Sequence, residues 1–366
     1  MRTTLRIAIA LGAVLVAAGP AVRDARGGLF DSLKDKVKDE AKKKAMEMAK
    51  EKLSEAVSKK KLADPPGEPE DAFMGEYVGT CKPADGKSCE AEAKVVGYLD
   101  KKKDTWSWDV VLTAKCGLNL KAKGAKDGGK VKLSGDVTGQ VADGKLTASG
   151  DKGSFELKKH VRKSPTLGAK PPSGAIVLLP YEEGKATNLD EWTNQNWVLI
   201  SDGSALVKRG SSLTKRKFRD FKLHVEFYCP YMPDRRGQGR ANSGCYMHSK
   251  YEVQVLDSFG LKPAMGDCGS IYGVRITSKN SSLPPGQWQT YDITFRGPRV
   301  GLLGNVKEWP KFIEVLHNGV KIQENVEVKK ITTAGKGGKH VEAGEIMLQD
   351  HGNPVRFRNI WLVETK

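Results

Sequence analysis

The densest cluster of polar side chains in the sequence lies between Arg240 and Asp257. Residues 251–256 alternate, which predicts a strand with two valines on one face and with Glu252 and Gln254 on the other. A carboxylate beside an amide offers hydrogen-bond donors and acceptors together, and sugar hydroxyl groups need both. The pattern therefore indicates a site for a hydroxylated ligand; the alternative is a solvated strand face with scattered charge.

Two other carboxylates are candidates to act with Glu252. Glu226 lies in the predicted strand 221–228, and Asp257 ends the strand that carries Glu252. Two carboxylates near one glycosidic bond allow one to act as an acid and the other as a base. By contrast, His224 lies between two apolar residues and is predicted to be structural.

The C-terminal tail supplies further polar candidates, Gln349, His351 and Arg356. His351 lies at a predicted turn, and imidazole changes charge near neutral pH, so it could carry a proton or bind a metal. The alternative is a solvent-exposed turn residue. The sequence contains no serine-nucleophile elbow, phosphate-binding glycine loop or paired-histidine metal helix.

The region that carries these residues, 175–366, reads as a series of short strands without a helix. Together they predict a two-sheet sandwich of the jelly-roll kind. Asn318 and Gly319 separate two of the strands and predict a type I′ hairpin. The predicted strands are 176–179, 197–200, 221–228, 245–247, 251–256, 288–295, 311–316, 320–322, 344–349 and 355–363.

Upstream of the sandwich, residues 72–163 are predicted to form a small antiparallel β domain, because short alternating runs are separated by Gly, Asp and Lys. Trp106 and Trp108 lie two positions apart and so share one face of a strand. They are either core residues or a platform on which a sugar could stack. The proline-containing segment 164–174 is predicted to be a linker.

The N-terminal 25 residues have the order of a secretory signal peptide. Arg2 and Arg6 precede the apolar run 7–18, and small residues follow it. The run is shorter than the roughly 20 residues needed to span a bilayer, although an uncleaved anchor is the alternative. We therefore expect a secreted or periplasmic protein, with the cleavage point left open.

Residues 29–62 are predicted to form an amphipathic helix, because apolar residues recur at helical spacing opposite lysines and acids. Such a helix could contact an envelope or membrane surface, form a solvated stalk, or pack on the body of the protein. Residues 63–71, ADPPGEPED, predict a linker.

The net charge of +17 is distributed along the chain rather than gathered in one element. This distribution argues against a nucleic-acid partner, because such proteins cluster their basic residues. None of the six cysteines has the spacing of a zinc site. In an exported protein disulfides are allowed, and Cys81 with Cys89 would close a short loop; the connectivity stays open.

The C-terminal region resembles a known family, the 3-keto-disaccharide hydrolase domain. The matching stretches occur in the order of the family over about residues 175–366. They are FKLHVEF (221–227), GQGRANSGCY (237–246), YEVQVLDSFG (251–260), CGSIYG (268–273), PPGQWQTYDITFRGPR (284–299), LHNGV (316–320) and LQDHGNPVRFRNIWL (348–362).

The resemblance implies a concanavalin-like jelly roll and an enzyme of the glycoside hydrolase or lyase type. A ketone at C3 of the sugar acidifies the C2 proton, and removal of that proton lets the glycosidic oxygen leave by β-elimination. Motif position implies Glu252, Asp257 and His351 as catalytic candidates, with Glu252 or His351 as the base. The substrate-binding candidates are Glu226, Asn242, Gln254, Gln349 and Arg356. Motif position implies Asn242 and Gln254 among them, and the implied chemistry needs a positive group at the C3 oxygen, for which Arg356 is the candidate.

No cofactor follows from the sequence with certainty, and a divalent metal ion is left open. The expected partner is an oligosaccharide or glycoside. One departure from the family pattern is Tyr228, where arginine often follows the Glu-Phe pair. The alternative function is a non-catalytic carbohydrate-binding or envelope protein on the same sandwich. Sugar, linkage and oligomeric state are not encoded in any motif.

Overall fold

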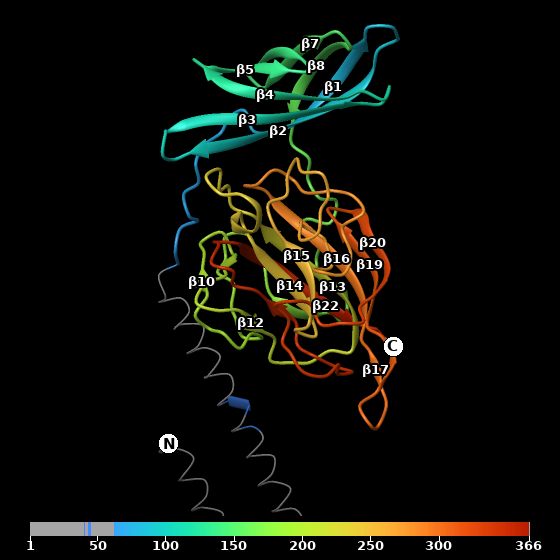
Figure 1. Ribbon diagram of the computed structural model, residues 1–366. Helices are drawn as coiled ribbons and strands as arrows, with labels where there is room; N and C mark the ends of the chain where they lie inside the picture. The colour runs from blue at the N-terminus through green and yellow to red at the C-terminus, as the bar shows by residue number, and fades with distance from the viewer. Residues whose placement is uncertain (1–39, 41–42, 45–61, 366) are drawn as a thin grey trace, which may run out of the picture. The chain divides into compact units, whose positions relative to one another are not determined.

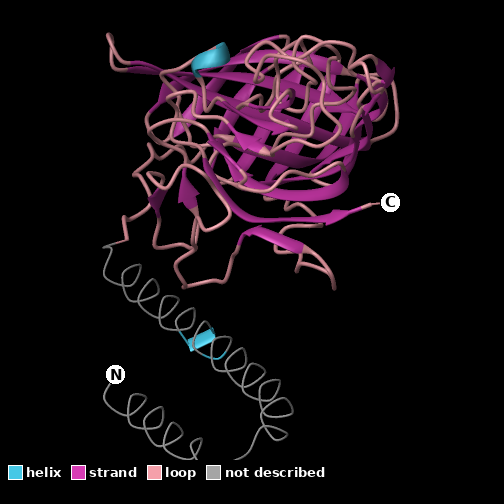
Figure 2. Ribbon diagram, turned by 90° about the horizontal axis from the view of Figure 1, so that it is seen from below, coloured by secondary structure: helices cyan, strands magenta, loops and turns pink. Residues whose placement is uncertain are grey.

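The computed structural model describes residues 40, 43–44 and 62–365. The predicted signal peptide and nearly all of the predicted helix 29–62 lie outside these residues; of the four described positions within that range, Glu40, Lys43 and Lys44 are helical and Leu62 is not. No helix of the described chain is long and apolar enough to cross a membrane. Residues 62–366 form one compact unit, and strands and loops make up nearly all of its described part (Figure 2).

The small β domain is a closed barrel of eight antiparallel strands, a more specific architecture than the one predicted (Figure 1). The barrel closes because β8 pairs with β1, with Cys81 opposite Phe155. Its strands are β1 (Gly75–Pro83), β2 (Cys89–Asp100), β3 (Thr105–Ala114), β4 (Asn119–Asp127), β5 (Lys130–Gly135), β6 (Thr138–Ala142), β7 (Lys145–Gly150) and β8 (Gly153–His160).

Alternate residues of these strands point inward and form one apolar core, in which Trp108 is 2% exposed. Strands β4 and β6 carry little alternating apolar signal in the sequence, because their inward residues are small or few. Gly124 of β4 illustrates the reason: a Cβ there would lie 2.5 Å from Val131 and 3.0 Å from Trp108. The bulk of Trp108 therefore requires a neighbouring strand with little apolar signal of its own.

Cys89 and Cys116 form a disulfide in the barrel. The loop closure between Cys81 and Cys89 considered from the sequence is therefore wrong for this structure, although these two residues face each other across β1 and β2. Cys81 is a free and buried thiol, as are Cys229, Cys245 and Cys268 in the sandwich.

The C-terminal region is a two-sheet sandwich, as predicted. The larger sheet has the order β10-β11-β22-β13-β16-β19-β20 with β9 on β22, and the smaller has the order β12-β21-β14-β15. The strands of the larger sheet are β9 (Ile176–Leu179), β10 (Val198–Leu199), β11 (Ala205–Leu206), β13 (Asp220–Tyr228), β16 (Trp288–Arg296), β19 (Lys311–His317), β20 (Val320–Glu327) and β22 (Arg356–Glu364). Those of the smaller are β12 (Ser212–Leu213), β14 (Ser243–Met247), β15 (Tyr251–Val255) and β21 (Met347–Leu348), and β17 (Arg299–Val300) with β18 (Val306–Glu308) forms a separate ribbon.

The sandwich core lies between the two sheets. Tyr251 of the smaller sheet packs on Phe295 of the larger, with ring centroids 5.8 Å apart. The Tyr291 hydroxyl donates to the backbone oxygen of Gln254 at 2.6 Å. The predicted hairpin is confirmed: Asn318 and Gly319 both have positive φ, 51° and 77°, as a type I′ turn requires.

The two segments predicted as linkers pack against the sandwich. Ala63 forms a bridge with Ile200. In the second segment the Ser164 hydroxyl lies 2.6 Å from the Thr290 hydroxyl, and the Gly168 amide donates to Glu226 at 2.6 Å. Both segments therefore contribute ordered contacts, which joins the barrel and the sandwich into one compact unit.

Candidate active site

The outward face of the smaller sheet carries the polar side chains predicted from the alternation of residues 251–256. Across β14 and β15, Tyr246 faces Glu252 and Gly244 faces Gln254. The alternate residues point into the core, where Val253 is fully buried. Gly244 is needed here because a Cβ at that position would lie 2.5 Å from Glu252 Oε1. The missing side chain leaves room for the Glu252 carboxylate over the strand.

Glu252 is only 2% exposed. Burial raises the pKa of its carboxyl from 4.5 to about 7, and a hydrogen bond from Tyr246 opposes part of that rise. Burial also holds the pKa of Tyr246 well above its usual range, so its hydroxyl stays protonated. A carboxylate that titrates near neutral pH beside a permanent hydroxyl donor suits general base catalysis.

Amide side chains surround this pair. Gln254 Nε2 donates to Gln238 Oε1 at 3.1 Å and to Asn242 Oδ1 at 3.3 Å. Asn242 Nδ2 also donates to Gln238 Oε1, at 3.0 Å. Gln349 Nε2 donates to the Tyr246 hydroxyl at 2.9 Å, so the hydroxyl oxygen accepts from Gln349 while its proton is directed at Glu252.

Two oxygens in this group are buried and accept no hydrogen bond: Oε1 of Gln254 and Oε1 of Gln349. Buried polar atoms are nearly always paired, so unpaired acceptors point to a ligand that supplies the donors. Gln238 is exposed and lies on a short 3₁₀ turn, Gly237–Gly239. Its side chain covers the group from the solvent side and also donates to the Gly266 oxygen at 3.0 Å.

Four of the predicted site residues therefore meet on one face: Asn242, Glu252, Gln254 and Gln349. Two further members of this group, Tyr246 and Gln238, were not predicted from the sequence. The same period-two alternation, applied to residues 243–247, would have placed Tyr246 on the face away from Cys245 and Met247, whereas its pairing with Glu252 depends on the strand register. Gln238 lies in a loop, where no periodicity marks it.

Asp257 is engaged elsewhere. Its Oδ2 accepts from Arg240 Nε at 2.6 Å, and its Oδ1 accepts from the Phe259 amide at 3.2 Å. Both side chains of the ion pair are buried. No hydrogen bond joins Asp257 to Glu252 in the described chain, so its place in the structure is that of a counterion for Arg240.

Glu226 and Arg356 lie on the larger sheet and not beside Glu252. Glu226 accepts from Arg358 Nε at 2.7 Å and from Asn359 Nδ2 at 2.8 Å. Arg356 pairs with Asp202 and covers the ring of Tyr228 at 3.9 Å. These bonds leave neither side chain free to meet a sugar at Glu252.

The two predicted histidines differ in environment. His351 is exposed, in the turn that follows Gln349, and has no hydrogen-bond partner among the described residues. His224 is buried, as the structural prediction requires, with Nδ1 2.6 Å from Asp292 Oδ1. His351 thus lies two residues after Gln349 in the chain but takes no part in the hydrogen bonds around Glu252.

A family model described as the 3-keto-alpha-glucoside-1,2-lyase-like domain matches residues 174–363, more than half of the chain. The match spans both sheets and every residue of the polar face around Glu252. The chain belongs to this family. Its sandwich, the lyase-like domain, is a glycoside hydrolase or lyase domain, and a carbohydrate is the substrate that such a domain implies.

Three solved structures of proteins from Parabacteroides distasonis ATCC 8503, each described as a "putative glycosyl hydrolase", are similar to the chain. The first is 34% identical with a TM-score of 0.47, and the match covers 53% of this chain and 85% of that one. The second is 17% identical with a TM-score of 0.35, covering 50% and 92%. The third is 19% identical with a TM-score of 0.35, covering 49% and 95%. No curated protein matches the chain.

The donor set around Glu252 in the lyase-like domain contains amides, a hydroxyl and one carboxylate. Among the described residues, a grouping of three His, Cys or carboxylate ligand atoms within 4.8 Å occurs at Cys81, Cys89 and Cys116 of the barrel. Two of those sulfurs are joined in the disulfide. The described residues beside Glu252 do not form a three-ligand site of this kind.

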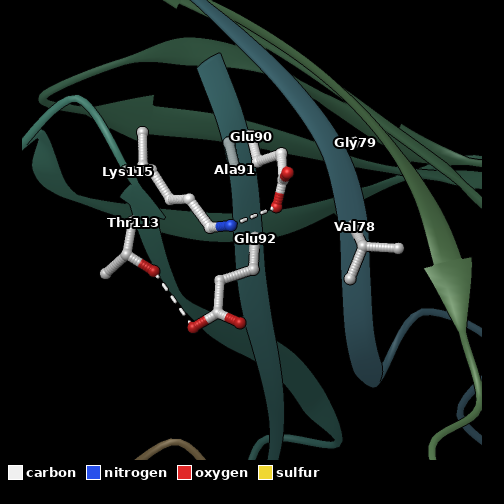
Figure 3. A pocket seen from close by; sticks show the side chains of 8 residues that line it. Val78, Gly79, Glu90, Ala91, Glu92, Thr113 and Lys115 are labelled. Carbon is white, nitrogen blue, oxygen red and sulfur yellow. Dashed lines mark hydrogen bonds and ion pairs between the residues drawn. The ribbon is translucent and has the colours of Figure 1, made fainter.

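The barrel carries a hollow of about 600 Å³ on its outer surface (Figure 3). Both of its glutamates have partners: Lys115 Nζ lies 2.7 Å from Glu90, and the Thr113 hydroxyl donates to Glu92 at 3.2 Å. Unlike the polar face of the lyase-like domain, this hollow presents no buried titratable group.

The barrel also supports the loop that carries Gln238 and Asn242. The Leu99 amide donates to the Pro233 oxygen at 3.0 Å. Arg236 and Arg240 both lie over the ring of Tyr98, at 3.8 and 5.3 Å from its centroid. Tyr98, on a barrel strand, therefore positions the loop of the lyase-like domain through its aromatic ring.

Replacing this ring is expected to impair catalysis from a distance. Tyr98→Ala should lower kcat/KM by roughly 2- to 30-fold, because loss of the cation–π contacts loosens the loop that holds Gln238. Tyr98→Phe keeps the ring and should retain activity, which makes it the matched control. Steady-state kinetics of the two variants provide the measurement, and equal kcat/KM values would contradict a positioning role for Tyr98.

The raised pKa of Glu252 also predicts how stability depends on pH. A carboxyl whose pKa rises from 4.5 to about 7 on folding stabilises the folded state fully below pH 4.5. This stabilisation is lost as the pH rises through 7. Glu252→Gln removes the titrating group. The free energy of unfolding of this variant, minus that of wild type, should therefore be about 3 kcal/mol larger at pH 8 than at pH 4. Urea unfolding at both pH values tests this, and a difference independent of pH would be inconsistent with the raised pKa.

Proposed function

We propose that the protein cleaves 3-keto glycosides by removing the C2 proton and eliminating the glycosidic oxygen. The observation that carries the proposal is Glu252, a lone buried carboxylate with a pKa near 7 that faces Tyr246 among two unpaired amide oxygens. Membership of the lyase-like family supports the substrate class.

In the proposed reaction the Glu252 carboxylate takes the C2 proton of the sugar. The C–H electron pair moves between C2 and C3, and the C3 carbonyl oxygen becomes an enolate oxygen. Once Glu252 is protonated it no longer needs the hydrogen bond from Tyr246, and the Tyr246 hydroxyl, held by Gln349, donates its proton instead to that oxygen and stabilises its charge. The buried oxygens of Gln254 and Gln349 accept hydrogen bonds from sugar hydroxyls and orient the ring.

The enolate then returns its electrons to form the C1–C2 double bond, and the C1–O bond breaks. The departing oxygen takes the proton that Glu252 removed from C2, so the elimination needs no further reactant. Addition of water across the double bond gives the free 3-keto sugar, and the sum of the two steps is hydrolysis. An ordinary glycoside has no C3 ketone to acidify C2 and therefore lacks this route.

The test is a cleavage assay with a 3-keto glucoside beside its unoxidised parent. We expect release of the alcohol from the keto sugar alone, in the presence or absence of chelator. Equal cleavage of both sugars would indicate an ordinary glycosidase mechanism, and cleavage of neither would remove the proposed activity.

We further propose that the protein is secreted or periplasmic. The order of residues 1–25 supports export, and the Cys89–Cys116 disulfide suits an oxidising compartment. N-terminal sequencing of the protein purified from the extracytoplasmic fraction tests this; recovery of intact Met1 from the cytoplasm would contradict it.

A further inference from the structure

Three aromatic side chains gather at one end of the barrel. Trp106 and Trp108 stack with their ring centroids 5.9 Å apart and their planes 18° apart, and Phe73 meets Trp108 edge-on at 5.6 Å. Trp108 belongs to the barrel core, whereas Trp106 is only partly buried and packs against that core from the end. Of the two tryptophans, Trp108 is thus a core residue and Trp106 is partly on the surface. The sequence had allowed either a core role or a surface role for the pair.

A hydrogen-bond node fixes the orientation of these rings. Asp71 Oδ2 accepts from Trp108 Nε1 at 3.0 Å and from the Tyr231 hydroxyl at 2.9 Å. Gly97 of β2 leaves the space for this node, because a Cβ there would lie 2.1 Å from the same Asp71 oxygen. The Trp106 ring therefore rests on a neighbour that cannot rotate, and the exposed part of the ring is preorganised.

The rings border a hollow of about 240 Å³. Glu70 and Lys126 also line it, and both are exposed. No hydrogen bond or ion pair engages either side chain within residues 62–365. An aromatic surface flanked by an acceptor and a donor matches a pyranose ring, whose C–H face packs on indole while its hydroxyls bond to polar groups. The mouths of β-barrels are a common place for such ligand sites.

We propose that this hollow is a second carbohydrate-binding site, which takes a sugar ring through Trp106, Glu70 and Lys126. It differs from the Glu252 face in requiring no ketone at C3, so unoxidised saccharides should bind here. The Trp106 ring lies 6.4 Å from Tyr231, which begins the chain segment leading to Gln238. The site would therefore hold a saccharide beside the loop that covers the catalytic face.

The test is titration of the full chain with maltotriose and with methyl α-glucoside, with binding measured by calorimetry and by tryptophan fluorescence. Trp106→Ala should weaken binding by at least about tenfold. Trp309→Ala is the matched control, because Trp309 is a partly exposed tryptophan that packs on His340 in the sandwich. It should leave the affinity unchanged.

Further variants keep the outcome decisive. Glu70→Gln and Lys126→Ala, both at exposed positions, should each weaken binding several-fold even if Trp106→Ala fails to fold. Glu252→Gln should bind the two saccharides as wild type does. The proposal is overturned if Trp106→Ala folds and binds normally, if wild type binds neither saccharide, or if Glu252→Gln abolishes binding. The last result would assign the binding to the catalytic face and leave the proposed elimination intact.

Discussion

Glu252→Gln is expected to lower kcat/KM on a 3-keto glucoside by about 1,000-fold while leaving the protein folded. The amide has nearly the same shape as the carboxylate but cannot take a proton from C2. Wild-type kcat/KM should also fall as the pH drops below about 7, because the raised pKa protonates the base in that range. Initial rates of wild type and variant, each followed across pH, provide the measurement.

Glu314→Gln serves as the matched control, since it makes the same chemical change at a partly exposed glutamate on β19. It should keep wild-type activity and pH dependence. If Glu252→Gln retained more than a tenth of the wild-type rate, Glu252 would not be the base. The exposed imidazole of His351 would then become the next group to test.

The second large effect is expected at Asp257, on stability rather than chemistry. Asp257→Asn removes the counterion of Arg240, whose guanidinium is buried and already has one unpaired nitrogen, Nη2. Leaving a buried charge unpaired costs about 3–5 kcal/mol. We therefore expect the midpoint of urea unfolding to fall sharply, while the folded fraction still cleaves the keto sugar.

Replacing both partners separates a structural role from a catalytic one. The double variant Arg240→Met with Asp257→Leu removes both charges and should recover most of the lost stability. A variant at Asp257 that keeps wild-type stability but loses all turnover would show instead that Asp257 takes part in the reaction.

Much of the fold follows from periodicity. The alternation Tyr251–Leu256 predicts which side chains face the core, and the Asn318-Gly319 pair predicts a hairpin; the structure confirms both. Strand β4 cannot be predicted from periodicity, because its inward positions carry small residues that leave room for Trp108. Closure of the barrel depends on the pairing of β1 with β8, which lie far apart in sequence.

The site residues, too, could be predicted only where local periodicity relates them. Glu252 and Gln254 could be placed together because they share one strand. Glu226 and Arg356 resembled site residues by type, but their strands belong to the other sheet, and no local pattern tells which sheet a strand joins. Asp257 forms an ion pair with Arg240, which lies 17 residues earlier in the chain. Residue spacing does not predict this pair either.

The central claim is proton removal from C2 followed by elimination, and isotope labelling tests it most directly. A 3-keto glucoside carrying deuterium at C2 should be cleaved more slowly than the unlabelled sugar by wild type. In ordinary water, the 3-keto sugar formed after hydration should lose at least part of its C2 label. Cleavage at equal rates with full retention of deuterium in the product would contradict the account, because it would mean that the C1–O bond breaks without ionisation at C2.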